Sequence, residues 1–521
     1  MDSEQQYSDI LAASTWTAAN VSPTPVVTYN YTGDYRVDTL IGGLDTRWNA
    51  ASPLATPVNV TYSFMTSAPT YGGTGDGMGV GFTAFNSAER SAVRQILSKV
   101  QAELNITFTE VSDSAWSYGQ IRFGNNYQTA SSGYSWLPNT AGEESGDVWM
   151  DAGTAANLAP APGNMGWDAL VHEIGHALGL KHPGNYNAGT VAQSAPGNYL
   201  GSAEDNLNYT VMSYYDASGG QPRDWYGEYD LQALKALYGA NPDFNGGNTT
   251  YRYSDSSGAT LSIIDDAWGA DTIDLSALSS GATVNLQPGA FSSIGVNHGV
   301  AAAGNVSIDL HTVVENVVAS AFNDVVQGND ANNRLTLGTG ANNADGGGGI
   351  DTAVYAGGRG SYAVTATSGQ LRVSGFNVTD SLTHVERLDF GDLKLAFDVS
   401  GAVGVVAKTL GAVFGSAAVG NVNFEGIGLG LMDTGMAAGD LMRFALTAKL
   451  GAGASDASVV DLLYSNVLGH APTQAEAAPF LQLLQGGDFT QASLGTLAAN
   501  CDANCANVNL VGLASTGVAY V

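Results

Sequence analysis

The chain has 521 residues, and its 18 Lys and Arg against 48 Asp and Glu give a formal net charge of −30. This length predicts several domains, and the charge argues against binding to nucleic-acid phosphates or to anionic lipid surfaces. A hydrophobic fraction of 44% excludes wholesale disorder. The 67 glycines and the excess of Asp favour turns that bind cations, whereas two cysteines are too few for a disulfide framework.

No membrane-crossing or N-terminal export signal is predicted. The first residues, MDSEQQYSDILAAS, lack the basic and apolar regions of a signal peptide. Residues 401–420 form the most apolar stretch, but Lys408 and several glycines interrupt it, and a transmembrane helix needs about 20 apolar residues. Residues 1–29 are polar and rich in Thr and Pro, which is typical of an N-terminal arm.

Residues 30–243 alternate between helix and strand patterns, which predicts an α/β domain. Helical spacing runs over residues 87–104, where Asn86 or Ser87 can cap the first turn, and again over 167–180 and 228–238. Alternating or β-branched runs predict strands at residues 58–64, 106–111, 120–124 and 146–151.

The pattern changes twice beyond residue 243. Residues 244–400 consist of short β-branched runs between Gly, Asn and Asp turns, which predicts an all-β domain of the parallel β-roll or sandwich type. Residues 401–521 return to helical spacing, so a small α-helical C-terminal module is expected. Ser or Thr caps and Gly stops predict helices at residues 455–469, 473–487 and 490–500.

Three of the seven histidines form a predicted metal site. His172 and His176 are four residues apart on a predicted helix, so their imidazoles share one face. Gly179 can adopt a positive φ that ends the helix, which lets His182 return to the same point. Three neutral imidazoles with a fourth position open are typical of one catalytic Zn²⁺. Glu173, beside the first ligand, is well placed to deprotonate the zinc-bound water.

The segment HEIGHALGLKHPGNYNAG, residues 172–189, resembles the zinc segment of the serralysins, a family of secreted bacterial metalloproteases within the metzincins. Val211-Met212-Ser213-Tyr214 resembles the Met-turn of that family. The resemblance implies that Met212 lies beneath the zinc ligands. It also implies that Tyr214 can ligate zinc at rest and swing away to stabilise the oxyanion. Asn185 stands where the family usually has Asp, which removes a carboxylate near the site.

The resemblance covers roughly residues 30–400 and implies a metzincin catalytic domain over residues 30–243. It includes the start of that domain at residues 35–48 and the long helix with its following strand at 82–111. Residues 132–134 and 146–150 occupy the place of the family's edge strand. An extended substrate would pair there by strand addition.

A nine-residue period runs through residues 319–354. Asp324, Asn333, Asn342 and Asp351 recur at this spacing among Gly-rich turns. Such a pattern is typical of a β-roll in which backbone carbonyls and carboxylates bind calcium. Two of the four positions are Asn, which lowers the charge available to the ion.

The last of these repeats matches the calcium pattern best, and Gly346, Gly347 and Gly349 complete its candidate ligands. The segment with Asp266, Gly269 and Asp271 resembles another calcium turn of the serralysins. Several structural Ca²⁺ ions are therefore expected. The alternative is a bare parallel β-roll or Gly-rich loops without calcium.

Calcium binding would relieve the charge repulsion of so acidic a chain, which gives a reason for folding outside the cell. Proteins with such repeats typically leave through type I secretion machinery, and residues 507–521 are the candidate export signal. The helical tail resembles domains appended to secreted repeat proteins, so it is expected to serve secretion or surface attachment. Cys501 and Cys505 can form a local disulfide or remain free thiols, and both alternatives stay open.

We interpret the chain as a secreted, extracellular zinc endopeptidase that hydrolyses protein substrates through a zinc-bound water activated by Glu173. It is expected to be a monomer without nucleic-acid partners. The alternative is a calcium-dependent surface or matrix protein with an inactive protease-like domain, and a surface-layer component is a third reading. Zinc content and casein hydrolysis, with Glu173→Ala as the control, distinguish these readings. The sequence names no cleavage preference.

Overall fold

The computed structural model describes residues 23–71, 80–129, 131–140, 142–186, 197–367 and 369–521. Contacts divide the chain into two compact units. One comprises Met1–Asp271 and Gln287–Val314, and the other comprises Thr272–Leu286 and Glu315–Val521. Most of the predicted arm, residues 1–22, lies outside the described residues. The division into four domains stays a prediction.

The first unit contains a five-stranded sheet in the order β2-β1-β3-β5-β4. Neighbouring strands run parallel except β4, which lies antiparallel to β5 at one edge. The strands are β1 (Val58–Phe64), β2 (Ile106–Glu110), β3 (Ile121–Asn126), β4 (Gly133–Ser135) and β5 (Asp147–Asp151). The four predicted strands are confirmed within two residues, whereas β4 is too short for its pattern to identify it.

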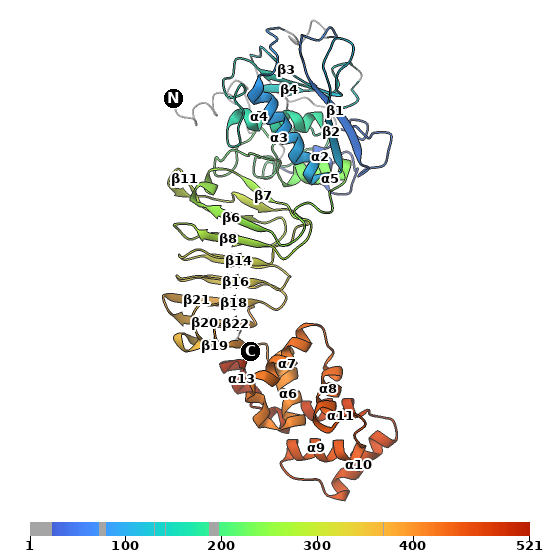
Figure 1. Cartoon of the computed structure of the whole chain (residues 1–521), viewed down its shortest axis with the longest axis vertical. Helices are drawn as coiled ribbons and strands as arrows, with labels where there is room; N and C mark the ends of the chain where they lie inside the picture. The colour runs from blue at the N-terminus through green and yellow to red at the C-terminus, as the bar shows by residue number, and fades with distance from the viewer. Residues whose placement is uncertain (1–22, 72–79, 130, 141, 187–196, 368) are drawn as a thin grey trace. The chain divides into compact units, whose positions relative to one another are not determined.

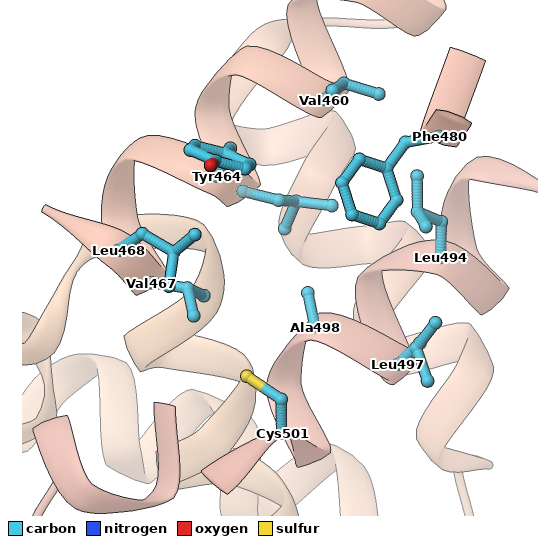
Figure 2. Close-up of a pocket in the computed structure, with 10 residues that line it drawn as sticks. Val460, Tyr464, Val467, Leu468, Phe480, Leu494, Leu497, Ala498 and Cys501 are labelled. Carbon is cyan, nitrogen blue, oxygen red and sulfur yellow. The ribbon is translucent and has the colours of Figure 1, made fainter. Parts of the chain in front are cut away.

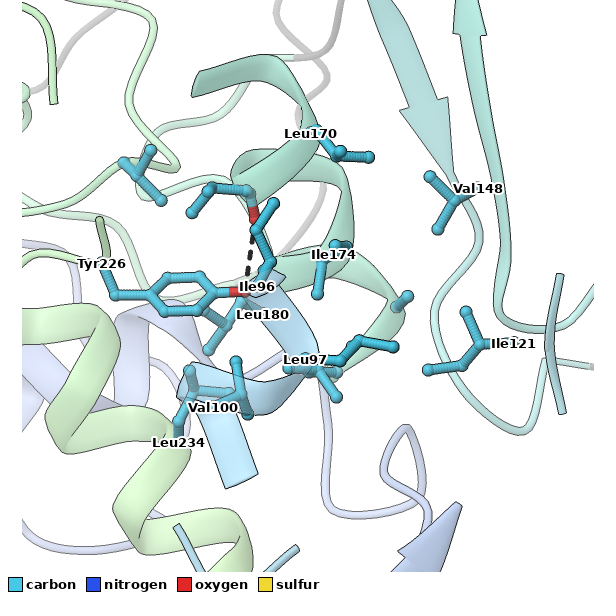
Figure 3. Close-up of a cluster of buried hydrophobic side chains, with 14 of the residues drawn as sticks. Ile96, Leu97, Val100, Ile121, Val148, Leu170, Ile174, Leu180, Tyr226 and Leu234 are labelled. Atoms are coloured by element: carbon cyan, nitrogen blue, oxygen red, sulfur yellow. Dashed lines mark hydrogen bonds between the residues drawn. The ribbon is translucent and has the colours of Figure 1, made fainter. Parts of the chain in front are cut away.

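Four helices accompany this sheet: α2 (Tyr35–Leu40), α3 (Ser87–Glu103), α4 (Met165–Ala177) and α5 (Glu228–Tyr238). The side chain of Asn86 accepts hydrogen bonds from the first turn of α3, and Glu89 reaches back to the backbone of Asn86. This capping box explains the sharp start of α3. Apolar side chains of α3, α4 and α5 meet in one core, where Ile96, Ile174 and Leu234 are fully buried (Figure 3).

The first unit also contains short strands of the β-rich region. A three-stranded sheet has the order β10-β13-β7, and β11 pairs with β12. The short strands of the first unit are β6 (Thr250–Ser254), β7 (Ser262–Ile264), β10 (Phe291–Ser292), β11 (Val296–Asn297), β12 (Val300–Ala301) and β13 (Val306–Ile308).

The second unit begins with a parallel β-roll. Each predicted repeat position immediately precedes a strand: Asp324, Asn333, Asn342 and Asp351 lead into β15 (Val325–Gln327), β16 (Arg334–Thr336), β17 (Asn343–Asp345) and β18 (Thr352–Val354). Successive repeats alternate between two sheets, because β15 pairs with β17 and β16 pairs with β18. Figure 1 shows β14, β16, β18 and β22 as consecutive strands of one sheet. The predicted all-β fold is confirmed for this region.

The two sheets have the orders β19-β20-β21-β17-β15-β9 and, within this unit, β24-β23-β22-β18-β16-β14-β8. The remaining strands are β8 (Thr272–Ala277), β9 (Thr283–Asn285), β14 (Asn316–Val318), β19 (Ala363–Thr367), β20 (Gln370–Gly375), β21 (Val378–Thr383), β22 (Arg387–Asp389), β23 (Lys394–Ala396) and β24 (Val518–Tyr520). The last residues of the chain therefore add an antiparallel strand beside β23.

The predicted helical module is confirmed. Its helices are α6 (Ala402–Phe414), α7 (Val422–Asp433), α8 (Ala438–Leu450), α9 (Asp456–Leu468), α10 (Gln474–Gln485), α11 (Gln491–Asn500), α12 (Asp502–Asn507) and α13 (Leu510–Thr516). None of the described helices is long and apolar enough to span a bilayer. Cys501 and Cys505 are free thiols.

Candidate metal centre

Helix α4 carries the first two histidines of the predicted site. Its amino end is capped by the side chain of Asn164, which accepts a hydrogen bond from the Trp167 N–H. The helix ends at Ala177 rather than at Leu180 as predicted, because Gly179 adopts a φ of 102°. A Cβ at this glycine would lie 2.6 Å from the Thr46 carbonyl oxygen, so only glycine fits the turn.

The structure brings His172, His176 and His182 together. The Nε2 atom of His182 lies 3.2 Å from that of His172 and 3.0 Å from that of His176. Among the described residues, these three form the one group of His, Cys, Asp or Glu with three or more ligand atoms within 4.8 Å of one another.

The opposite ring nitrogen of each histidine faces a backbone carbonyl. The Nδ1 atoms of His172, His176 and His182 lie 2.8, 2.7 and 3.0 Å from the carbonyl oxygens of Val211, Leu180 and Tyr186, respectively. A carbonyl oxygen can only accept, so each Nδ1 carries the hydrogen and each Nε2 presents a lone pair.

Burial keeps the imidazoles of His172 and His176 neutral. It lowers the pKa of His172 to about 4. The pKa of His176 is well below its usual value because of burial and the two neighbouring histidines. Three converging lone pairs repel one another unless a cation lies between them. A tetrahedral zinc ion about 2.0–2.1 Å from each nitrogen separates its ligands by about 3.3 Å, so this donor set fits zinc.

Glu173 lies beside the triad on α4 and is buried. Its Oε2 atom has no hydrogen-bond partner among the described residues, and burial raises the pKa of the carboxyl group to about 8. Gly133 of the edge strand β4 packs against it. A Cβ at residue 133 would lie 2.8 Å from Glu173 Cγ and 3.0 Å from Oε1. The absence of a side chain at residue 133 therefore leaves room for the carboxylate.

The two predicted Met-turn residues lie close to the histidines and to the helix that carries two of them. Met212 is fully buried, and its sulfur lies against Gly175 of the ligand-bearing helix. The Tyr214 ring centroid lies 4.6 Å from that of His182 and 6.0 Å from that of His172. Both residues are thus assembled with the triad, whereas their catalytic roles stay predictions.

The roles of three residues at this centre were missed by sequence reasoning. Asp205 and Asp230 are buried beside the Met-turn, and Gly133 adjoins Glu173. The position of Asp230 three residues after Gly227, at the start of a predicted helix, was a usable signal for a capping role. Neither Asp205 nor Gly133 belongs to a local pattern that would identify it.

The predicted calcium residues fall on two sides of the β-roll. On one side, Asp324 accepts hydrogen bonds from the backbone of Ala282 and Ser320, and Asn342 accepts one from the Asp324 N–H. Asp380 accepts from the Asn342 N–H and from the Tyr355 hydroxyl. Every carboxylate oxygen of this row already has a hydrogen-bond donor, and calcium binding by Asp324 and Asn342 stays a prediction.

The other side of the roll differs. Asp351 accepts a hydrogen bond from the Asn333 N–H through Oδ1, but its buried Oδ2 has no partner among the described residues. Oδ2 lies against Gly346, and burial raises the pKa of this carboxyl group to about 7. Gly347 and Gly349 adopt positive φ, as the Gly-rich turn predicts. This turn fits a cation better than the Asp324 row.

The third predicted calcium segment lies in the first unit. The Tyr251 hydroxyl donates to Asp266, 2.6 Å away, and the Thr249 N–H donates to Asp271, 2.8 Å away. Gly269 packs against the Gly247 carbonyl and the Asp271 carboxylate. These residues lie close in space, and calcium binding by them stays a prediction.

The helical module contains an apolar pocket of about 190 Å³ between α9, α10 and α11. Figure 2 shows Tyr464, Phe480, Leu497 and Cys501 around it. Its lining is almost entirely carbon.

Comparison with known proteins supports the same centre. A family model described as Metallo-peptidase family M12 matches residues 61–225, and one described as Peptidase M10 serralysin C terminal matches residues 228–414. A Serralysin of Proteus mirabilis is 34% identical over 324 residues, which are 56% of this chain and 63% of that protein. Serralysin C of Dickeya chrysanthemi is 32% identical over 310 residues, 54% of this chain and 60% of that protein.

A Metallopeptidase AprA of Pseudomonas marginalis is 31% identical over 301 residues, 53% of this chain and 61% of that protein. The chain thus spans about three fifths of the length of these curated relatives. The two matched regions cover the histidine triad, the Met-turn and the β-roll. Residues 61–225 are thus similar to M12 metallopeptidases, residues 228–414 are similar to the serralysin C-terminal region, and the curated relatives that the chain resembles are serralysins and a related metallopeptidase.

Proposed function

We propose that this chain is a secreted zinc endopeptidase that hydrolyses peptide bonds in protein substrates. The observation that carries the proposal is the convergence of three Nε2 lone pairs at 3.0–3.2 Å beside the Glu173 carboxylate. His172, His176 and His182 would hold the ion. Zinc supplies Lewis acidity and lowers the pKa of a bound water to about 7.

The residues around the triad have complementary roles in this proposal. Glu173 takes a proton from the attacking water and delivers it to the leaving amine. The Tyr214 phenol donates a hydrogen bond to the oxygen that becomes negative in the transition state. An extended substrate pairs with β4, which is the last strand in the sheet order. The free Oε2 of Glu173 and the closeness of Tyr214 to His182 support these assignments.

We further propose that the protein acts outside the cell as a monomer after type I secretion, and that the turn containing Asp351 binds Ca²⁺. The acidic composition and the unpartnered Oδ2 of Asp351 support this part of the proposal. The helical tail would contribute to export or surface attachment.

Glu173→Gln is the decisive variant, because it replaces the proposed base with a neutral group of the same shape. We expect casein hydrolysis to fall by about 10²–10⁴-fold, the usual contribution of general base catalysis. Zinc content, measured by mass spectrometry, should stay at one ion per chain. Retained hydrolysis in the variant would contradict the assigned role. A wild-type chain that binds zinc and hydrolyses nothing would favour the inactive, calcium-dependent surface protein.

A further inference from the structure

The Met-turn is attached to two buried carboxylates that contact no zinc ligand directly. Asp230 of α5 accepts hydrogen bonds from the Val211 N–H and the Gly227 N–H, each at 2.7 Å. The carbonyl of Val211 in turn accepts from His172 Nδ1. Asp230 therefore fixes the backbone that orients the first ligand.

Asp205 holds the other end of the turn. Its Oδ1 atom accepts hydrogen bonds from the hydroxyls of Tyr186 and Ser213, each at 2.7 Å. The Tyr186 carbonyl accepts from His182 Nδ1, and the Tyr186 ring stacks on His182 with centroids 5.6 Å apart. The Ser213 hydroxyl also accepts from the N–H of Tyr215, so Ser213 on one side of Tyr214 is bonded to Asp205 and Tyr215 on the other side is linked to Asp205 through Ser213.

One carboxylate thus connects the segment of His182 with the segment of Tyr214. The Tyr186 hydroxyl adds a second link, because it also lies 3.4 Å from the Tyr214 N–H, which donates to it. The Tyr186 and Tyr214 rings have centroids 4.9 Å apart. A shift of the His182 segment would therefore disturb the hydrogen bonds that position Tyr214, and a shift of the Tyr214 segment would disturb those that position His182.

The burial of Asp205 argues for a specific role. It is 2% exposed, and its Oδ2 atom has no hydrogen-bond partner among the described residues. The Lys181 ammonium attracts it, and this ammonium donates to the carbonyl of His182. A buried carboxylate costs free energy that apolar packing at the same place avoids. Its donors come from the two segments that carry functional side chains.

We propose that Asp205 is a positioning residue that fixes His182 and Tyr214 in a single arrangement through Tyr186 and Ser213. It acts on the metal only through the His182 imidazole and on the substrate only through the Tyr214 phenol. This inference rests on the proposed function, because Tyr214 acts there on the reacting oxygen.

The test removes one donor at a time and leaves the carboxylate in place, since deleting it would leave two buried hydroxyls unpaired. Tyr186→Phe should speed zinc loss to a chelator by about 10–100-fold, the usual effect of losing support for a ligand. Ser213→Ala should lower kcat about tenfold at unchanged KM. It should leave zinc loss within about twofold, since Ser213 contacts the Tyr186 hydroxyl, 3.5 Å away, rather than the Tyr186 carbonyl that orients His182.

The matched control is Tyr71→Phe, which removes an equally short hydrogen bond, of 2.7 Å, from a tyrosine hydroxyl to the buried Asp147. It should lower the melting temperature and leave zinc loss and kcat unchanged. The double variant Tyr186→Phe/Ser213→Ala should show a kcat loss that is not the product of the single losses, because both hydroxyls act on one carboxylate.

Two outcomes separate this inference from the proposed function. If Tyr186→Phe loses zinc no faster than Tyr71→Phe in a chain that hydrolyses casein, the positioning role of Asp205 is wrong and the peptidase stands. If the wild-type chain hydrolyses nothing but Tyr186→Phe still loses zinc faster, the peptidase proposal is wrong and Asp205 keeps its role toward His182.

Discussion

At the scale of single residues, the triad is oriented by neutral partners. Each Nδ1 faces a backbone carbonyl and not a carboxylate, so the chain fixes the tautomer of three histidines without adding negative charge. The buried carboxylates of Asp205 and Asp230 bond to Tyr186 and Val211, whose carbonyls orient the histidines, rather than to the histidines themselves. The net charge of the metal centre therefore depends on the ion and Glu173.

Gly133 gives the first prediction at this scale. In Gly133→Ala, the new Cβ would meet Glu173 Cγ at 2.8 Å, and Cγ cannot move without displacing the carboxylate. A misplaced general base should lower kcat by about 10–100-fold while zinc content stays at one ion per chain. Steady-state kinetics with a peptide substrate measure the effect.

Gly439→Ala is the matched control, because nothing lies within 4 Å of its added Cβ. It should leave kcat unchanged. Equal kcat in Gly133→Ala and wild type would mean that Glu173 does not need the space beside β4.

Asp147 gives a pH-dependent prediction. Burial raises the pKa of this carboxyl group from 3.8 to about 8. Between these values the folded chain keeps a proton that the unfolded chain has released, so the free energy of unfolding falls as the pH rises. In Asp147→Asn this group cannot titrate, and the fall in stability between pH 5 and pH 8 should become smaller.

Urea unfolding at several pH values provides the measurement. Asp243→Asn, which removes an exposed carboxylate, is the matched control for the substitution itself. Parallel slopes for Asp147→Asn and wild type would show that Asp147 is ionised in the folded chain throughout this range.

At the scale of elements, the end of α4 decides whether the site can form. The helix supplies two ligands four residues apart, but the third must return across the chain reversal at Gly179. The N–H of Leu180 bonds to the Gly175 carbonyl there, and the Leu180 carbonyl accepts from His176. The turn that ends α4 therefore also orients His176, the second ligand.

Gly179→Ala should destabilise the chain strongly. The positive φ alone costs roughly 1–3 kcal/mol for a residue with a side chain, and the added Cβ would also lie 2.6 Å from the Thr46 carbonyl. Urea unfolding should show a larger loss than in Gly435→Ala, where φ is 92° but nothing lies within 4 Å of the Cβ. Equal losses would mean that Thr46 moves aside freely.

At the scale of the whole molecule, the chain consists of two compact units, and the proposed zinc and calcium sites lie in different units. The histidine triad belongs to the first unit, and the Asp351 turn belongs to the second. Ligands that bind only the folded state raise its stability by mass action. Each ion should therefore stabilise the unit that contains its site.

Calorimetry tests this separation. Removing zinc should lower the melting temperature of the first unit, and removing calcium should lower that of the second. Asp351→Asn should abolish the response to calcium. Asp324→Asn should lower stability by the same amount with and without calcium, because its oxygens accept backbone hydrogen bonds. A calcium response that survives Asp351→Asn would place the ion elsewhere.

Much of the fold and the centre was predictable because the signals are local. The spacing of His172, Glu173 and His176, the capping of α3 at Asn86 and the nine-residue period each depend on neighbours in sequence. Helices α6 to α8 were not individually predicted, since glycines and β-branched residues weaken the helical signal in their sequences. The strand β4 was predicted only through a family resemblance.

The sequence by itself determined the candidate metal ligands, the proposed base and the order of α/β, β-roll and helical regions, because side-chain chemistry and short-range periodicity depend on residues that are close in sequence. Only the tertiary structure decided which carbonyl orients each histidine, that Asp205 joins two distant segments, and which side of the roll keeps an unpartnered carboxylate oxygen. Those properties arise from contacts between residues far apart in the chain, whose distances no local pattern encodes.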